Sequence, residues 1–88
     1  MAALVGGDLE QLQALEQQFR VDAQAVGELR SRVSSVLGAT AWTGPAADRF
    51  RQEWASSFST ALLHLANALE ENAAVVASRR QAIAMATA

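Results

Sequence analysis

The side chains that could do chemistry are few and widely spaced in this sequence. His64 is the only histidine, it stands between two leucines, and no carboxylates surround it at a metal-ligand spacing. The chain has no cysteine, which excludes disulfides and thiolate metal sites. No glycine-rich phosphate loop follows a strand. No base is placed to activate a serine, the serines being Ser31, Ser34, Ser35, Ser56, Ser57, Ser59 and Ser78. We therefore expect a protein that is not an enzyme and binds neither a metal nor a cofactor.

One polar pair is a candidate for a structural role. Asp22 interrupts the apolar spacing of the first predicted helix, and counting from the predicted turn brings it level with Ala61, within one turn of His64. A contact between Asp22 and His64 would place one polar pair in an apolar seam, which can fix the register of two helices. The alternative is that both side chains face solvent.

Length and composition limit the chain to one small domain. Of its 88 residues 51% are hydrophobic but only 6% are aromatic, so most of the buried side chains must be small. A chain of this size is marginally stable alone unless disulfides, a metal or a partner supports it. Because cysteine is absent, we expect association with another chain to supply the additional buried surface.

The charge and hydropathy patterns argue against nucleic-acid binding and against stable membrane insertion. The net charge is −2 and the seven basic residues, all arginines, are scattered, so we expect no nucleic-acid binding. No segment approaches the roughly 20 apolar residues of a membrane-spanning helix, so we expect no stable membrane insertion. Residues 1–7 are predicted to be a flexible lead-in and lack the features of a signal peptide.

The spacing of apolar residues predicts two amphipathic helices. The first spans about residues 8–37, with Asp8 as its N-cap and Gly38 as the glycine that ends it. The second spans about residues 45–84, is capped by Thr43 or Gly44, and has Pro45 in its first turn. The first helix has a narrow heptad seam of Leu12, Leu15, Phe19, Val26, Leu29, Val33 and Val36. The second has a broader stripe of Phe50, Trp54, Phe58, Ala61, Leu62, Leu65, Leu69, Val76 and Ile83.

The short connection, about residues 38–44, predicts an antiparallel two-helix hairpin that occupies the single domain, residues 1–88. One neighbouring helix cannot cover the broad stripe of the second helix. Two hairpins together would cover it, so the sequence predicts an all-α fold that pairs into a four-helix-bundle dimer. The residues expected at this bundle interface are Leu15, Phe19, Val26, Leu29, Phe50, Trp54, Phe58, Leu62, Leu65 and Leu69.

The turn carries a resemblance to a known family. Trp42-Thr43-Gly44 stands between two amphipathic helices, and Phe50 and Trp54 follow it in the second helix. This arrangement, with the chain length and the absence of cysteine, resembles the WXG hairpin family of bacterial type VII (ESX) secretion, which includes the early secretory antigenic target. The resemblance covers essentially the whole chain and makes Trp42 and Gly44 the expected turn and secretion motif.

The resemblance implies a dimer that is exported folded. Members of the family pair into four-helix-bundle homodimers or heterodimers, usually with the product of a neighbouring gene. A membrane-embedded machine with an FtsK-like secretion ATPase exports them without a cleaved signal peptide, so the protein would be cytoplasmic before export and extracellular after it. In the family the turn tryptophan, here Trp42, lies beside the C-terminal end of the partner's second helix. There it forms a composite export signal with a Tyr-x-x-x-Asp/Glu motif in the tail.

This sequence departs from the family pattern because it contains no tyrosine. The resemblance therefore favours the subunit of a heterodimer that contributes the WxG turn, while a second WXG-family chain contributes the tyrosine tail. A homodimer with another targeting arrangement remains open. The sequence is also compatible with an escort that pairs with the helical N-terminus of a larger secreted toxin, with a membrane-disrupting protein and with a cytosolic helical bundle unrelated to secretion.

Overall fold

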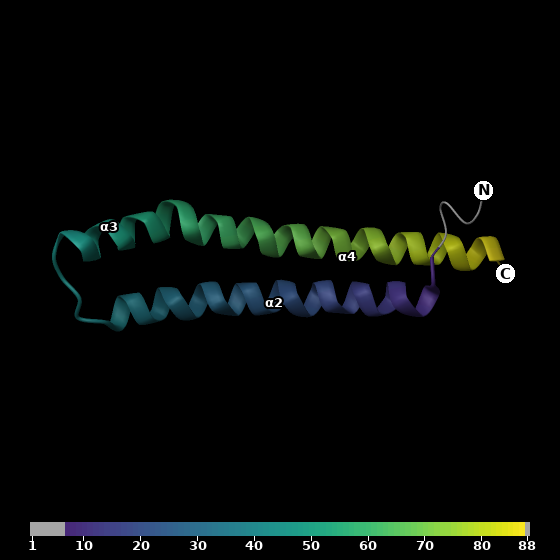
Figure 1. Cartoon of the computed structure of the whole chain (residues 1–88), viewed down its shortest axis with the longest axis horizontal. Coiled ribbons are helices and arrows are strands. Elements are labelled where there is room, and N and C mark those ends of the chain that lie inside the picture. The colour runs from purple at the N-terminus through teal and green to yellow at the C-terminus, as the bar shows by residue number, and fades with distance from the viewer. Residues whose placement is uncertain (1–6, 88) are drawn as a thin grey trace.

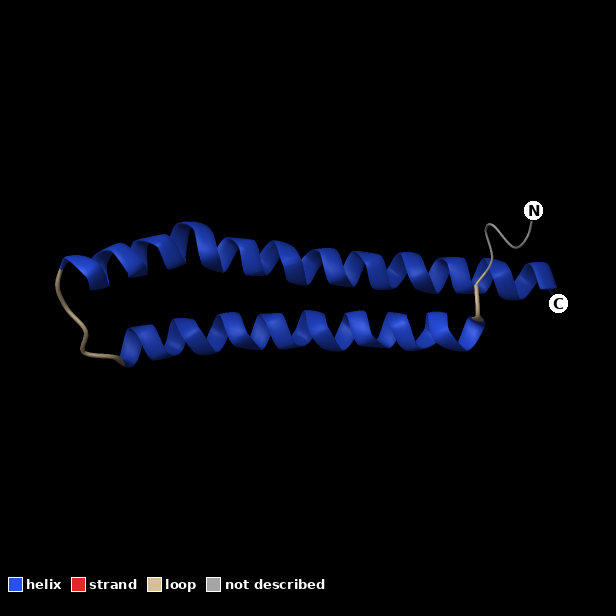
Figure 2. Cartoon of the chain, in the orientation of Figure 1, coloured by secondary structure: helices blue, strands red, loops and turns tan. Residues whose placement is uncertain are grey.

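Two long helical arms lie side by side and run in opposite directions (Figure 1). This computed structural model describes residues 7–87. The first arm is α2 (Leu9–Ala39), and the second consists of α3 (Pro45–Glu53), the π-helical turn η1 (Trp54–Phe58) and α4 (Ser59–Thr87). Figure 2 shows helix along both arms, and residues 7–87 contain no strand. The predicted all-α class is therefore confirmed, while the pairing of two hairpins concerns a second chain and stays a prediction.

Local chemistry explains where the helices begin. The Asp8 carboxylate accepts a hydrogen bond from the Gln11 backbone N–H at 2.9 Å, which confirms Asp8 as the N-cap of α2. Pro45 begins α3 directly after Gly44, as predicted, because its fixed φ suits the first helical turn and its missing N–H has no helical partner there. The predicted flexible lead-in falls almost entirely on residues 1–6, which lie outside the described residues.

The end of α2 differs from the prediction. The helix continues through Gly38 to Ala39, so the expected end near residue 37 with Gly38 as the terminating glycine is wrong. Thr40 ends the helix in an extended conformation with φ −92°, and its hydroxyl donates a hydrogen bond to the Val36 carbonyl at 2.6 Å. A side chain thus satisfies a terminal carbonyl, and no left-handed glycine is needed. At the other end of the chain, α4 extends to Thr87 rather than to residue 84.

The second arm is interrupted by the π turn, which the sequence pattern did not predict. In η1 the Ser59 backbone N–H donates to the Trp54 carbonyl, five residues back, instead of four. Helical spacing from Phe50 and Trp54 predicts Phe58 as the next residue facing α2. Because the π turn inserts one residue, Ser59 takes that position and is buried, while Phe58 is rotated outward and is 44% exposed.

Only small side chains are enclosed between the arms. The buried apolar residues of the described chain are Ala23, Ala47 and Ala73. Larger apolar residues that face the opposite arm are only half-buried, because one neighbouring helix covers one side of each. They are Leu12, Phe19, Val26, Val33 and Leu37 of α2, and Phe50, Trp54, Leu62, Leu69, Val76 and Ile83 of the second arm.

Two polar contacts connect the middle of the arms. The Arg30 guanidinium donates through Nε to the hydroxyl of Ser59 at 2.7 Å and to its carbonyl at 3.0 Å. The indole N–H of Trp54 donates to the Ser34 hydroxyl at 2.9 Å. Both contacts lie beside the π turn. The inserted residue therefore places a hydroxyl where Arg30 can use it, and the register of the arms is fixed at this level.

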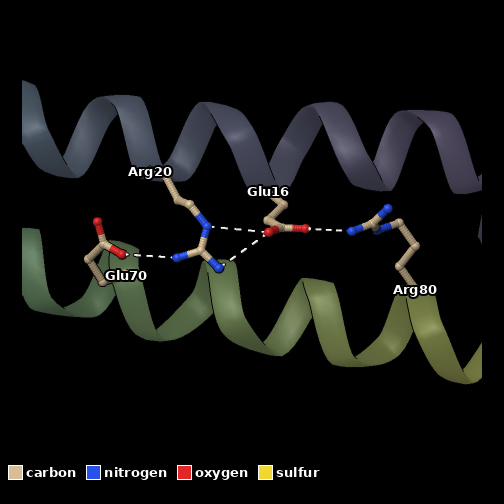
Figure 3. Close-up of polar contacts among 4 residues, drawn as sticks. All are labelled: Glu16, Arg20, Glu70 and Arg80. Atoms are coloured by element: carbon tan, nitrogen blue, oxygen red, sulfur yellow. Dashed lines mark hydrogen bonds and ion pairs between the residues drawn. The ribbon is translucent and has the colours of Figure 1, made fainter.

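A charged network connects the arms nearer the chain ends (Figure 3). Glu16 accepts from Arg20 of its own helix at 3.2 Å and from Arg80 of α4 at 3.0 Å. Arg20 also donates to Glu70 of α4 at 3.1 Å. Glu16 is the best shielded of the four, with 15% of its side chain exposed, so its two ion pairs are the least screened by solvent.

The candidate contact between Asp22 and His64 is not present. Asp22 accepts a hydrogen bond from Gln18 of its own helix at 2.8 Å, and His64 is exposed. Since Leu62 faces α2, the residue two positions later points to the opposite side of α4. The register is fixed instead by Arg30 with Ser59 and by the network around Glu16.

Replacing Ala73 by leucine tests whether the space between the arms is too narrow for a large side chain. Ala73 is 0% exposed, so a larger side chain must push the arms apart or leave its rotamer minimum. We expect Ala73→Leu to lower the free energy of unfolding by about 1–3 kcal/mol, measured by urea denaturation with circular dichroism. Ala74→Leu is the matched control, because Ala74 is exposed. Equal stability of the two variants would contradict this description of the contact.

Candidate functional site

The loop at residues 40–44 forms the tip of the hairpin, at the opposite end from the start of α2 and the end of α4 (Figure 1). It contains the Trp42-Thr43-Gly44 motif, and Trp42 is 41% exposed there. Gly44 has φ +112° and ψ 175°, a backbone conformation that side chains with a Cβ rarely adopt. The glycine of the motif is therefore required by the path of the chain, whereas the tryptophan is not.

Arg51 of α3 reaches back to the tip and binds three carbonyl oxygens. Its Nη1 donates to the Trp42 carbonyl at 2.6 Å, and its Nη2 donates to the carbonyls of Leu37 at 3.1 Å and Thr40 at 3.0 Å. Its guanidinium carbon also lies 5.8 Å from the centre of the Trp42 ring, within the range of a cation–π contact. One side chain thus joins the end of α2, the loop and the motif tryptophan.

An aromatic row leads from the tip to the outside of the second arm. The rings of Trp42 and Phe50 have centroids 6.2 Å apart, and those of Phe50 and Phe58 are 6.1 Å apart. Both pairs are tilted, with interplanar angles of 47° and 46°, which is a favourable geometry for aromatic contacts. The half-buried Phe50 therefore connects two rings that are both largely accessible.

Large apolar side chains also remain exposed along one side of the hairpin. In each arm they directly precede a residue that faces the other arm, so they lie about 100° around the helix from it. The arms are antiparallel, and the same rotation in both places these residues on the same side of the hairpin. We call this set the apolar face; it consists of Leu15, Leu29, Val36, Phe58, Leu65 and Val75, which are between 40% and 59% exposed.

The residues expected at the bundle interface divide into two groups. Six are half-buried and face the opposite arm of the same chain, namely Phe19, Val26, Phe50, Trp54, Leu62 and Leu69. The other four, Leu15, Leu29, Phe58 and Leu65, belong to the apolar face. The apolar spacing did not separate these two groups, because the residues of both groups recur at helical intervals along the chain. Burial of the second group by another chain stays a prediction.

Arg51 and the π turn are the features that the sequence patterns did not identify. A signal for Arg51 exists, because the last turn of α2 contains no basic residue to pair with its terminal carbonyls. A cation must then come from elsewhere, and the nearest downstream arginines are Arg49 and Arg51. The sequence signal for the π turn is weaker. It consists only of Ser59, which directly follows Phe58 and supplies a hydrogen-bond acceptor for Arg30 of the opposite helix.

The described residues show no other arrangement with an evident chemical role. Residues 7–87 contain no cluster of three or more histidine, aspartate or glutamate side chains able to hold a metal ion. Within the same part of the chain, no helix combines the length and the apolar character needed to cross a bilayer. No protein-family model matches the sequence, and searches of curated proteins and of solved structures found no match.

The backbone at Gly44 allows a paired test of the tip. A Cβ at Gly44 meets no neighbouring atom, so the cost of Gly44→Ala comes from its positive φ alone, and we expect a loss of about 1–3 kcal/mol in unfolding free energy. Gly38 lies in the helix with open space around its Cβ position. Gly38→Ala should therefore stabilise the protein by about 0.5–1 kcal/mol. Thermal and urea unfolding measure both changes, and Gly44→Ala at wild-type stability would contradict the described turn.

Proposed function

We propose that this chain is a non-catalytic WXG-type protein that pairs with a second WXG-family chain and is exported by a type VII secretion system. It contributes the WxG turn to a heterodimeric four-helix bundle, and the partner contributes the tyrosine-containing tail. The pair is recognised by the secretion ATPase in the cytoplasm and leaves the cell folded, without a cleaved signal peptide.

The observation that carries this proposal is the position of Trp42. Trp42 is 41% exposed at the tip of an antiparallel hairpin, two residues before the glycine of the same motif, whose positive φ suits glycine alone. Exposing a large aromatic ring is unfavourable in an isolated chain, because its burial contributes about 1.5–3 kcal/mol. The turn itself needs Gly44 and Pro45 but not a tryptophan. A ring in this place is therefore suited to contact with another molecule.

The apolar face supports the pairing. Leu29 and Leu65 lie on the same side of the two arms, and they keep 40% and 48% of their surface exposed within the chain. A second hairpin laid against this side would bury both arms together, which is the geometry of a four-helix bundle. The acidic and basic side chains around Glu16 connect the arms to each other, so pairing on the apolar face does not disrupt them.

An escort for a larger toxin would use the same surface. The helical N-terminus of the toxin would cover the apolar face in the same way as a small sibling chain. The mass of the bound chain distinguishes the two, since a sibling has a size similar to the 9.3 kDa of this protein. A homodimeric effector is distinguished by a complex that contains only this chain.

Leu65→Asp tests the pairing surface. A carboxylate on the apolar face would have to be buried unpaired in the complex, so we expect at least about 100-fold weaker pairing, or about 2.8 kcal/mol. Native mass spectrometry of the tagged chain isolated from its own host measures the loss of the complex. Leu63→Asp is the matched control: Leu63 is similarly exposed, at 39% against 48%, but directly follows an inward-facing residue and so lies on the other side of α4. Equal effects of the two substitutions would contradict pairing through the apolar face.

Trp42→Ala tests export. We expect this variant to keep its helical circular dichroism and its complex, because the ring lies outside the contact between the arms, but to reach the medium at a level at least about tenfold lower. Deleting the secretion ATPase should abolish export of the wild-type chain. Thr43→Ala, at the exposed and variable position of the motif, is the control and should be exported normally. Continued export without the ATPase would refute the proposed route.

A further inference from the structure

Three carbonyl groups at the tip accept hydrogen bonds from one side chain, Arg51. The last carbonyls of α2 have no intrahelical partner, and the last turn of α2 contains no basic residue. The loop makes little contact of its own: the Trp42 N–H donates to the Thr40 carbonyl at 2.9 Å, and the Asp48 N–H donates to the Gly44 carbonyl at 3.0 Å. The carbonyls of Leu37, Thr40 and Trp42 all converge on Arg51.

The Arg51 guanidinium suits this set of acceptors in charge and in shape. The C-terminal end of a helix carries partial negative charge, which a cation stabilises. The planar guanidinium of Arg51 presents two nitrogens in a fixed geometry. One binds the Trp42 carbonyl, and the other bridges the carbonyls of Leu37 and Thr40. A lysine ammonium is a single point charge on a flexible stem and cannot reproduce this arrangement.

Arg51 holds the motif tryptophan at two points. It binds the Trp42 backbone carbonyl at 2.6 Å, and its guanidinium carbon lies 5.8 Å from the centre of the same residue's ring. The adjacent Phe50 lies against the ring with a centroid distance of 6.2 Å. Both the backbone and the indole of Trp42 are therefore oriented by consecutive residues of α3, while the residue remains 41% exposed.

We propose that Arg51 is the positioning residue of the WxG turn: it locks the loop against α2 and presents the Trp42 ring in one orientation to the partner that recognises it. Without Arg51 the helices remain, but the loop carbonyls turn to water and the ring samples many orientations. The orientation of Trp42 is a property of the folded chain. Its consequence for export rests on the proposed function.

The first experiment measures the orientation of Trp42 directly. The full chain is labelled with 5-fluorotryptophan, and its two ¹⁹F resonances are assigned with Trp42→Phe. In Arg51→Gln we expect the Trp42 resonance to move toward the position of free 5-fluorotryptophan, while the Trp54 resonance stays in place. Arg51→Lys should give an intermediate shift. Arg49→Gln, an exposed arginine on the same helix, is the matched control and should leave both resonances unchanged.

A Trp42 resonance in Arg51→Gln that stays within the wild-type linewidth would overturn the proposal. If Arg51→Gln loses its helical circular dichroism, Arg51→Lys decides: a displaced Trp42 signal at wild-type helicity supports the positioning role, and an unchanged signal overturns it. This measurement does not depend on secretion.

The second experiment measures export from the host. We expect Arg51→Gln to lower the level in the medium at least tenfold at an unchanged cellular level, and Arg49→Gln to have no effect. If Trp42→Ala is itself exported normally, the proposed function fails and the ¹⁹F result for Arg51 stands. If Trp42→Ala blocks export while Arg51→Gln displaces the ring and is exported normally, the presenting role of Arg51 is overturned and the proposed function stands.

Discussion

Two helices in contact can enclose side chains only along the single line where they meet, and this constraint governs the rest of the structure. The chain is 63 Å long but only 19 by 13 Å across, so only small side chains can be enclosed on every side. In the described part of the chain, the buried residues are Ala23, Ala47, Ala73 and Ser59. Within the described part of the chain, every larger apolar side chain keeps part of its surface in water, and the residues of the apolar face are only about half covered. A fold of this kind gains most of its buried surface when a second chain lies against it.

The same narrow contact explains why polar side chains have such a large part in holding the arms together. Arg30 can bond to Ser59 only because the π turn rotates the second arm by one residue, and that rotation also moves Phe58 outward. One local irregularity therefore fixes the register inside the hairpin and enlarges the apolar face outside it. Arg51 joins α2, the loop and α3 at the tip, and the network around Glu16 joins the two arms nearer the start of α2. Each connects segments that have little apolar contact.

Much of the architecture could be predicted from the sequence because it depends on local signals. Asp8 and Pro45 mark helix starts through their own side-chain chemistry, and apolar spacing identifies the two arms. The end of α2 could not be placed in this way because Gly38 resembles a terminating glycine, while Thr40 and Arg51 satisfy the terminal carbonyls through contacts that spacing does not reveal. Asp22 and His64 do not pair because His64 lies on the side of α4 away from α2, and because the contacts of Arg20 with Glu70 and of Arg30 with Ser59 set a register that differs from the one counted from the turn. At the candidate site, Trp42 and Gly44 are identified by their motif. The lack of a basic residue in the last turn of α2 leaves both Arg49 and Arg51 as candidates, and only the folded chain shows that Arg51 binds the loop.

Coverage of the apolar face by a second hairpin is the feature on which the proposed function depends most. Sedimentation equilibrium on the purified chain at micromolar concentration, with circular dichroism on the same sample, tests it most directly. We expect either a fully helical dimer or a poorly helical, aggregating chain that becomes a monodisperse, helical complex once its partner is added. A monodisperse monomer of 9.3 kDa that is fully helical, unfolds cooperatively and gains no stability from any second chain would contradict it.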